Sequence, residues 1–178
     1  PVITTATDIH GVFAIDSWAR RQNLCIINPE RIKWVSARLL AGETLRLKSF
    51  FPVRGQLPPG LILDDQEYDA LITYRNRGRQ QALRLVPPAI TLGVGCKKGV
   101  GADVLEEALA RTLAKAGCLP QAICRVCSID LKAAEPGLLE FCRNRKLPLQ
   151  TFSARELAAV KGSFTGSDFV RQTTGVDN

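Results

Sequence analysis

Three consecutive segments determine the expected fold: AITLGVG at residues 89–95, GADVLEEALARTLAKAG at residues 101–117 and AICRVCSID at residues 122–130. The first and third are short apolar runs of the kind that form buried strands, and the middle one has the apolar spacing of an amphipathic helix. A strand, a helix and another strand in this order predict parallel strands covered by a helix.

The same alternation continues to residue 160. EPGLLEFCRNRK at 135–146 predicts a helix, LPLQTF at 147–152 a strand, and SARELAAV at 153–160 another helix. We therefore expect residues 89–178 to form a three-layer α/β/α domain with a largely parallel (mixed) sheet. In such folds ligands bind beyond the carboxyl ends of the strands, so the loops at 93–99, 128–136 and 152–156 become the candidate site.

Residues 1–88 predict a smaller, incomplete α/β region. Its expected elements are a helix over 8–23 with Asp8 as N-cap, a strand over 24–27, a helix over 29–42 with Asn28 as N-cap, a strand over 43–50, and two short strands within 61–74. The stretch from 75 to 88 is polar and ends in two prolines, which favours a domain boundary there.

Composition and charge fit a soluble globular protein. The chain has 178 residues, 46% of them hydrophobic and 23% charged, and a net charge of +7. The basic excess is spread over both halves, which is not typical of a nucleic-acid-binding protein but suits a small polyanionic partner. No apolar run is long enough for a membrane span and no signal peptide is visible, so we expect no membrane association and a cytoplasmic location. The absence of an initiating Met indicates a piece of a longer protein; the oligomeric state is not predicted.

The six cysteines do not predict a metal site. CRVC at 124–127 is a lone C-x-x-C pair, and the only histidine, His10, is far away in the sequence. Structural zinc sites need four ligands, usually from two spaced pairs. We therefore expect reduced thiols packed in the core and neither a metal nor disulfides.

The glycine-rich loop GVGCKKGVG at 93–101 does not match a nucleotide-binding fingerprint. A dinucleotide fingerprint starting at Gly93 needs glycine at 98, where Lys98 stands, and neither Gly93 nor Gly95 has the spacing of a P-loop. Two lysines and a following helix N-terminus suit carboxylates or phosphates. The alternative is a tight strand-to-helix turn with solvated lysines.

Two further loops carry polar groups. Ser128, Asp130, Lys132 and Glu135 follow a predicted strand directly, which places donors and titratable groups near the expected crevice. The alternative reading is simply the start of a helix at Glu135. In the last loop, Ser153 with a glutamate three residues later is a capping box, a structural motif that leaves ligand contact possible.

Together these loops resemble a known family. GVGCKKG, SIDLKAAEPGLLEF and PLQTFSARELAAVKG look like the C-terminal domain of the CbiG family, which includes the stand-alone CobE proteins. Upstream, VITTATDIHGVFAIDSWARRQNL resembles the segment that leads into that domain. The resemblance divides the chain into a linking region, 1–88, and a C-terminal domain, 89–178, truncated at its end, and it implies that most of an N-terminal domain is absent.

The resemblance implies a function in anaerobic cobalamin (vitamin B12) biosynthesis. The family opens the δ-lactone of cobalt-precorrin-5A and releases acetaldehyde, giving cobalt-precorrin-5B. A non-catalytic corrinoid carrier of the CobE type is the alternative. The expected partner is a cobalt-corrinoid polycarboxylate, and no separate cofactor is expected because the substrate carries the cobalt. The absent N-terminal domain is a further expected partner and a possible location of catalytic groups.

The resemblance and the loop positions together nominate the site residues. The expected catalytic groups are Glu135, Asp130 and Lys132, with Glu135 preferred as the base because it is one step farther from Lys132 in the sequence than Asp130 is. Lys132 and the N–H groups around Gly95 to Lys97 are expected to meet the developing oxyanion. The expected substrate-binding residues are Gly93, Gly95, Cys96, Lys97, Lys98, Gly99, Ser128, Phe152 and Ser153.

Overall fold

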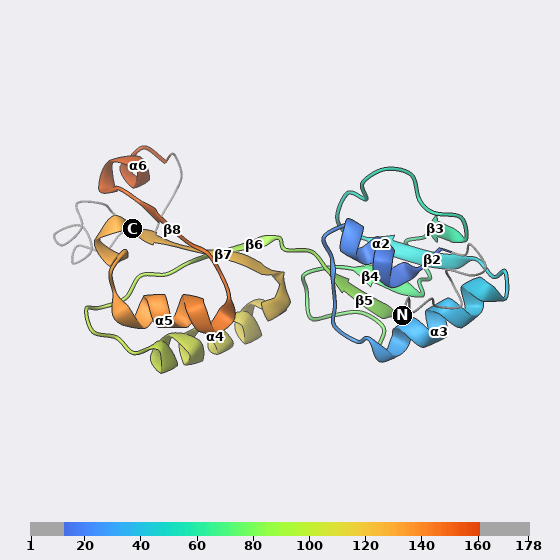
Figure 1. The fold of residues 1–178 in the computed structure, drawn as a ribbon, viewed down its shortest axis with the longest axis horizontal. Coiled ribbons are helices and arrows are strands. Elements are labelled where there is room, and N and C mark those ends of the chain that lie inside the picture. The colour runs from blue at the N-terminus through green and yellow to red at the C-terminus, as the bar shows by residue number, and fades with distance from the viewer. Residues whose placement is uncertain (1–12, 161–178) are drawn as a thin grey trace, which may run out of the picture. The chain divides into compact units, whose positions relative to one another are not determined.

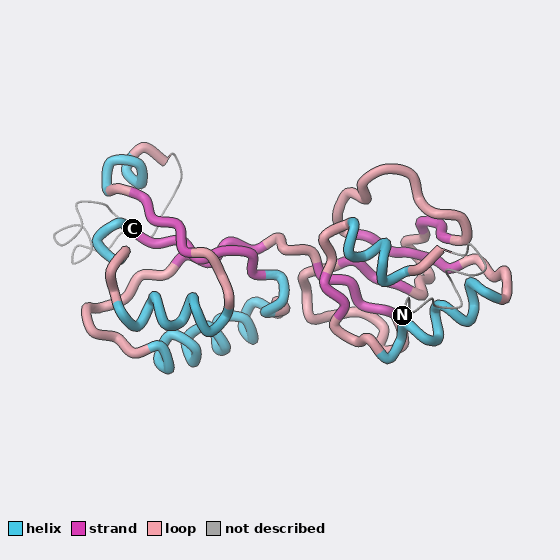
Figure 2. The backbone as a smooth tube through the Cα atoms, in the orientation of Figure 1, coloured by secondary structure: helices cyan, strands magenta, loops and turns pink. Residues whose placement is uncertain are grey.

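The computed structural model describes residues 13–160. The chain divides into two compact units. The first comprises the chain up to Ala89 together with Ala116–Ala122, and the second comprises Ile90–Lys115 and the chain from Ile123 onward. Figure 1 labels the elements of both, and Figure 2 shows the same backbone by secondary structure.

The second unit contains a three-stranded parallel sheet. Its strands are β6 (Ile90–Gly93), β7 (Ile123–Ile129) and β8 (Leu149–Phe152), in the order β6-β7-β8. Helix α4 (Ala102–Ala116) connects the first two, and helix α5 (Pro136–Arg145) connects the second to the third. The largely parallel α/β fold predicted from the alternation is confirmed.

Helices α4 and α5 lie together against the sheet (Figure 1). The Arg145 guanidinium of α5 contacts the Glu106 carboxylate of α4 at 2.8 Å. Their apolar faces share one core with the strands, formed by Ala102, Leu105, Leu109, Ile123, Val126, Leu138, Phe141 and Cys142. Each helix therefore buries an apolar stripe against β7, as amphipathic spacing requires.

The other face of this sheet is open within the described residues. Thr91, Arg125 and Gln150, which come from the three strands, are all exposed. Residues 13–160 therefore show a two-layer arrangement here, and the third layer stays a prediction.

The first unit contains a five-stranded mixed sheet in the order β1-β5-β4-β2-β3. Its strands are β1 (Cys25–Ile26), β2 (Leu45–Ser49), β3 (Leu61–Leu63), β4 (Ala70–Ile72) and β5 (Leu83–Val86). Among the strands that the structure describes in this sheet, β1 pairs antiparallel with β5, and the other pairs are parallel. The predicted alternation of β2 is confirmed, because Leu45 and Leu47 are fully buried whereas Arg46 between them is exposed.

Helices α2 (Ile15–Arg21) and α3 (Glu30–Leu40) cover this sheet with Ile15, Trp18, Val35 and Leu39 in the core. These helices correspond to the predicted helices over 8–23 and 29–42, and residues 8–12, with the predicted N-cap Asp8, lie outside the described residues. No helix within residues 13–160 is long and apolar enough to cross a membrane.

Two predictions in this unit are wrong. Asn28 does not cap α3: its side-chain amide donates to the Ala82 carbonyl at 2.9 Å and accepts from the Arg84 N–H at 2.8 Å. The end of the segment 75–88 is not merely polar, because β5 lies within it. Four residues are too short for a periodic signal, and β5 is identified only by its pairing with β4 and β1.

Candidate active site at the carboxyl ends of the strands

The three predicted loops lie at one edge of the parallel sheet. The strands β6, β7 and β8 end at Gly93, Ile129 and Phe152, and their parallel pairing places these ends together. A short 3-10 turn, η2 (Asp130–Lys132), follows β7 and contacts β8. The topology therefore brings the starts of loops 93–99, 128–136 and 152–156 together at the end of the sheet where α/β folds bind ligands.

The start of the glycine-rich loop is attached to β7. The Val94 N–H donates to the Cys127 carbonyl at 2.8 Å, and the buried Ser128 hydroxyl donates to the Val94 carbonyl at 2.7 Å. Ser128, predicted to bind substrate, thus uses its proton to position the loop. Gly93 and Gly95 are exposed, with open space where a Cβ would stand.

Glu135 holds the far end of the same loop. Its Oε1 accepts the Gly99 N–H at 2.7 Å, and its Oε2 is 3.0 Å from the Lys132 ammonium. Both side chains are largely buried, with exposed fractions of 6% for Glu135 and 18% for Lys132. The carboxylate therefore ties η2, the start of α5 and the glycine-rich loop together.

This environment favours the ionised form of Glu135. The hydrogen bond from the Gly99 N–H, followed by the contact with Lys132, lowers the pKa of Glu135 below the ordinary glutamate value, and the charge of Lys98 acts in the same direction. A general base working near neutral pH needs the opposite shift. The reason for preferring Glu135 over Asp130 as base is therefore wrong, because Glu135 is the direct partner of Lys132.

Close packing fixes the loop from a second side. A Cβ on Gly137, in the first turn of α5, would lie 1.9 Å from the Val100 carbonyl oxygen. The backbone of the loop can therefore contact the helix only because residue 137 has no side chain. Gly99 adopts φ +78°, a conformation that also favours glycine.

Unsatisfied donors lie between these two attachments. Within residues 13–160, no acceptor is found for the N–H groups of Gly95, Cys96 and Lys97. The ammonium groups of Lys97 and Lys98 are exposed and have no carboxylate partner in the same range. Consecutive backbone N–H groups and ammonium groups are the kinds of donor that bind carboxylates or phosphates in other proteins.

Cys96 lies beside the ion pair. It is half-buried, and burial raises the pKa of its thiol, with Lys132 acting in the opposite direction. A neutral thiol here is a packing group rather than a nucleophile. All six cysteines are free, and the described residues contain no group of three or more His, Cys, Asp or Glu side chains that could hold a metal.

The remaining candidates are Asp130, Phe152 and Ser153. The Asp130 side chain is exposed and has no hydrogen-bond partner among the described residues, and Phe152 is half-buried at the end of β8. Ser153 caps the short helix α6 (Ala154–Ala158), and the predicted capping box with Glu156 is confirmed.

Sequence reasoning missed the bond between Glu135 and Gly99. The only available signal was the spacing of three residues between Lys132 and Glu135, which is meaningful on a helix. Here Lys132 lies in a 3-10 turn and Glu135 is extended, so the two residues are not on one helix. Their pairing therefore could not be predicted from the helical spacing rule.

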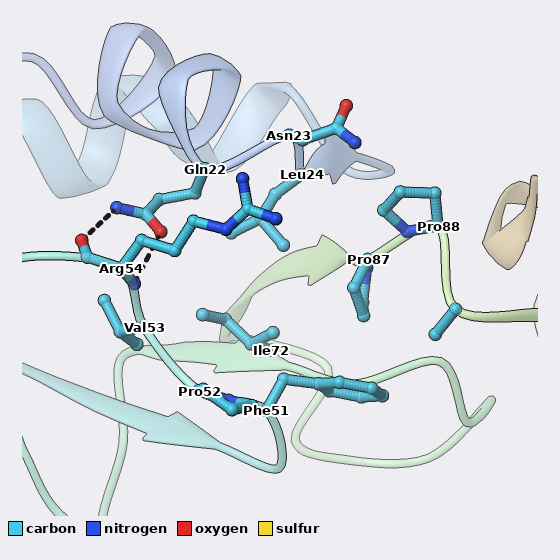
Figure 3. Close-up of a pocket in the computed structure, with 11 residues that line it drawn as sticks. Gln22, Asn23, Leu24, Phe51, Pro52, Val53, Arg54, Ile72, Pro87 and Pro88 are labelled. Atoms are coloured by element: carbon cyan, nitrogen blue, oxygen red, sulfur yellow. Dashed lines mark hydrogen bonds between the residues drawn. The ribbon is translucent and has the colours of Figure 1, made fainter.

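The first unit has a hollow of about 360 Å³ that sequence reasoning did not anticipate (Figure 3). Leu24, Phe51, Ile72 and Pro87 contribute apolar surface to its lining. The Gln22 side-chain amide bonds the backbone of Arg54 twice, at 2.8 and 2.9 Å, and so positions the segment that bears Phe51. The hollow has no acid–base pair, and we assign it no chemistry.

Comparison with known proteins identifies the family. A family model described as Cobalamin synthesis G C-terminus matches residues 90–178, which is half of the chain. The chain belongs to the CbiG family. This confirms the resemblance of the glycine-rich and 128–141 loops.

Similar proteins extend the match over the whole chain. The Cobalt-precorrin-5A hydrolase of Salmonella typhimurium is 31% identical over 99% of this chain and 54% of its own length. That of Priestia megaterium is 25% identical over 90% of the chain and 48% of its own length. This CbiG chain therefore spans about half the length of these relatives. A crystal structure of CobE, a protein from the cobalamin (vitamin B12) biosynthetic pathway, matches with 25% identity and a TM-score of 0.48, over 51% of this chain and 66% of that one.

Proposed function

We propose that the protein containing this chain is a cobalt-precorrin-5A hydrolase of cobalamin biosynthesis. The observation that carries the proposal is the 31% identity, over 99% of the chain, to a relative of that name. The anion-binding loop at the carboxyl ends of the strands supports it independently. A corrinoid intermediate carries several carboxylates, which fit free N–H groups and ammonium groups better than a nucleotide fits this loop.

The reaction makes two demands on the site. Water must add to the acyl carbon of the δ-lactone, which requires a base and donors for the oxyanion. The acyl carbon–oxygen bond of the lactone then breaks, which leaves a carboxylate and a hydroxyl on the two-carbon fragment. This hydroxyl loses its proton and becomes the carbonyl of acetaldehyde as the carbon–carbon bond to the macrocycle breaks. The electron pair of that bond passes into the macrocycle, where a proton is taken up. The cobalt belongs to the substrate.

The geometry supports a specific division of roles. The N–H groups of Gly95, Cys96 and Lys97 and the ammonium of Lys98 would hold a carboxylate or the oxyanion. Glu135 and Lys132 would act as positioning residues, because they form an ion pair with each other and both oxygens of Glu135 already accept a hydrogen bond. Asp130 is then the carboxylate of this loop that is available to activate water.

The remaining length of the relatives suggests a further contribution. This chain corresponds to about half of each one. We propose that the other half supplies a domain that completes the substrate site and that it includes the base if Asp130 does not serve.

Incubation of the complete protein with cobalt-precorrin-5A, followed by a coupled assay for acetaldehyde, tests the function. We expect one acetaldehyde for each macrocycle opened. Asp130→Asn should lower kcat by about 10²–10⁴, the range for loss of a general base, with KM unchanged. Glu135→Gln should raise KM, because it removes the ion pair with Lys132 while keeping an acceptor for the Gly99 N–H. Corrinoid binding without acetaldehyde release would contradict the hydrolase proposal and favour the carrier alternative.

A further inference from the structure

The first unit gathers cations around aromatic rings near the end of β2. The Arg77 guanidinium lies 4.9 Å from the centre of the Phe50 ring. The Lys48 ammonium lies 5.5 Å from the same ring and 5.9 Å from the ring of Tyr68. The Arg79 guanidinium lies 5.2 Å from the Tyr68 ring. We call these five residues the basic–aromatic patch.

Backbone contacts fix the patch. The Arg79 N–H donates to the Tyr68 hydroxyl at 3.1 Å. Gly78, between the two arginines, adopts φ +120°, and a Cβ there would lie 2.4 Å from the buried side chain of Leu71. The turn that presents Arg77 and Arg79 is therefore held against the sheet at a position that only glycine can occupy.

The cations of the patch, Lys48, Arg77 and Arg79, form no ion pair within residues 13–160, although the charge of Lys48 contributes to lowering the pKa of the nearby Asp64. The Lys48 ammonium donates to the Asp65 carbonyl at 2.6 Å. The nearby carboxylates of Asp64 and Glu67 are paired with a different residue, Arg46. A cation over a ring keeps its outer N–H groups free for an anion.

A hollow of about 530 Å³ adjoins the patch, with Phe50 and Arg77 in its lining. Thr73, Tyr74 and Arg75 also line it, and the Arg75 guanidinium lies 4.9 Å from the Tyr74 ring. Small-molecule sites typically measure about 300–1,000 Å³. The Phe50 side chain is 51% exposed, so an apolar surface lies directly beside the cations.

We propose that the basic–aromatic patch and its hollow bind an apolar face and peripheral carboxylates of a polycarboxylate macrocycle. The proposal rests on the proposed function and adds a second substrate contact in the first unit. Guanidinium groups pair with carboxylates through two parallel hydrogen bonds, and aromatic rings pack on conjugated faces.

Single-stranded nucleic acid also binds cations and rings, but it requires a groove that follows several nucleotides. The patch has three cations, and Arg75 adds a fourth in the lining of the hollow. Residues 1–90, which contain it, carry 12 basic and 8 acidic side chains, too little excess for a polyanion track. A compact polyanion fits this surface better.

Titration calorimetry on the complete protein tests the proposal. The probe is cobyrinic acid, a cobalt corrin with free peripheral carboxyl groups, with its methyl-ester form and oligo-dT as comparisons. Arg77→Gln/Arg79→Gln should raise Kd for cobyrinic acid about tenfold at low salt, an effect that shrinks as salt screens the contacts. The matched control, Arg20→Gln/Arg21→Gln, removes two exposed charges from the end of α2 in the same unit and should leave Kd unchanged.

The proposal would be overturned if the two double variants bound cobyrinic acid with equal affinity, or if the methyl ester bound as tightly as the free acid. It would also be overturned if oligo-dT bound more tightly than cobyrinic acid and depended on the same two arginines. Circular dichroism checks that the variants are folded. The acetaldehyde assay distinguishes failure of the patch proposal from failure of the hydrolase proposal. Turnover with normal KM in the Arg77→Gln/Arg79→Gln variant would reject the patch and leave the hydrolase proposal standing, whereas absence of turnover in the unmodified protein would reject the function itself.

Discussion

Glu135 shows how a single buried carboxylate can organise a loop. It accepts the Gly99 N–H with one oxygen and pairs with Lys132 through the other. Neither partner is adjacent in the sequence. The two interactions therefore join the start of α5, the glycine-rich loop and η2, which strand pairing alone does not hold together. The residue nominated as a base is thus better described as the anchor of the glycine-rich loop.

The lowered pKa of Glu135 predicts an acid-sensitive loop. Because the pKa is lower in the folded than in the unfolded protein, the anchor contributes its full stability above the ordinary glutamate value. That contribution is lost as the pH falls through the lowered folded value. NMR of the Gly99 amide during acid titration should show the hydrogen bond breaking in this acidic window, while the sheet remains intact.

The control for this titration is Glu135→Gln. Glutamine can still accept the Gly99 N–H but does not ionise, so the acid transition at Gly99 should disappear. An unchanged transition in the variant would mean that another group controls the loop.

For individual residues, the sequence predicts where a side chain lies in the fold better than it predicts which groups that side chain contacts. Placing Ser128, Asp130, Lys132 and Glu135 after one strand correctly predicts their location at the sheet edge. Their contacts depend on how far the loop from β6 reaches back to α5, which is set by backbone packing at Gly137 and leaves no pattern in the sequence.

At the scale of elements, the contact between α5 and the glycine-rich loop depends on Gly137. Gly137→Ala would gain up to about 1 kcal/mol of helix propensity. The new Cβ would, however, meet the Val100 carbonyl oxygen at 1.9 Å, and backbone cannot move aside as a side chain can. We expect the clash to dominate and to lower the free energy of unfolding by about 1–3 kcal/mol, measured by urea denaturation.

Gly95→Ala is the matched control in the same loop. Nothing lies within 4 Å of its added Cβ, so stability should change by no more than about 0.5 kcal/mol. Equal losses in the two variants would show that loop flexibility, and not the contact with α5, determines the effect.

The elements also show where periodicity is informative. The helices α4 and α5 and the strands β6, β7 and β8 are predicted because long amphipathic segments alternate with apolar runs. Asn28 has the composition of an N-cap, but its amide bonds the backbone at Ala82 and Arg84 instead. Asn28 can either cap the helix or form these tertiary hydrogen bonds with residues more than 50 positions away. The local sequence does not show which of the two it forms.

At the scale of the whole molecule, both units pair parallel strands and present cations beside the resulting loops or turns. The second unit offers Lys97 and Lys98 next to free N–H groups, and the first offers the basic–aromatic patch. Part of the basic excess, which is diffuse in the sequence, is thus grouped at these two places in the fold. This grouping arises because β2 and β4 are neighbours in the sheet although 20 residues separate their ends.

The central claim is that the glycine-rich loop binds the carboxylates of a corrinoid, and calorimetric titration with cobalt-precorrin-5A tests it most directly. The protein is compared with its Lys97→Ala/Lys98→Ala variant and with Lys33→Ala/Lys115→Ala, which removes two exposed lysines elsewhere. Charge-assisted bonds contribute about 1.5–3 kcal/mol each when desolvated, so the loop variant should lose at least about tenfold in affinity, and more at low salt. The control should bind normally. Equal affinity of the loop variant and the unmodified protein would contradict the account.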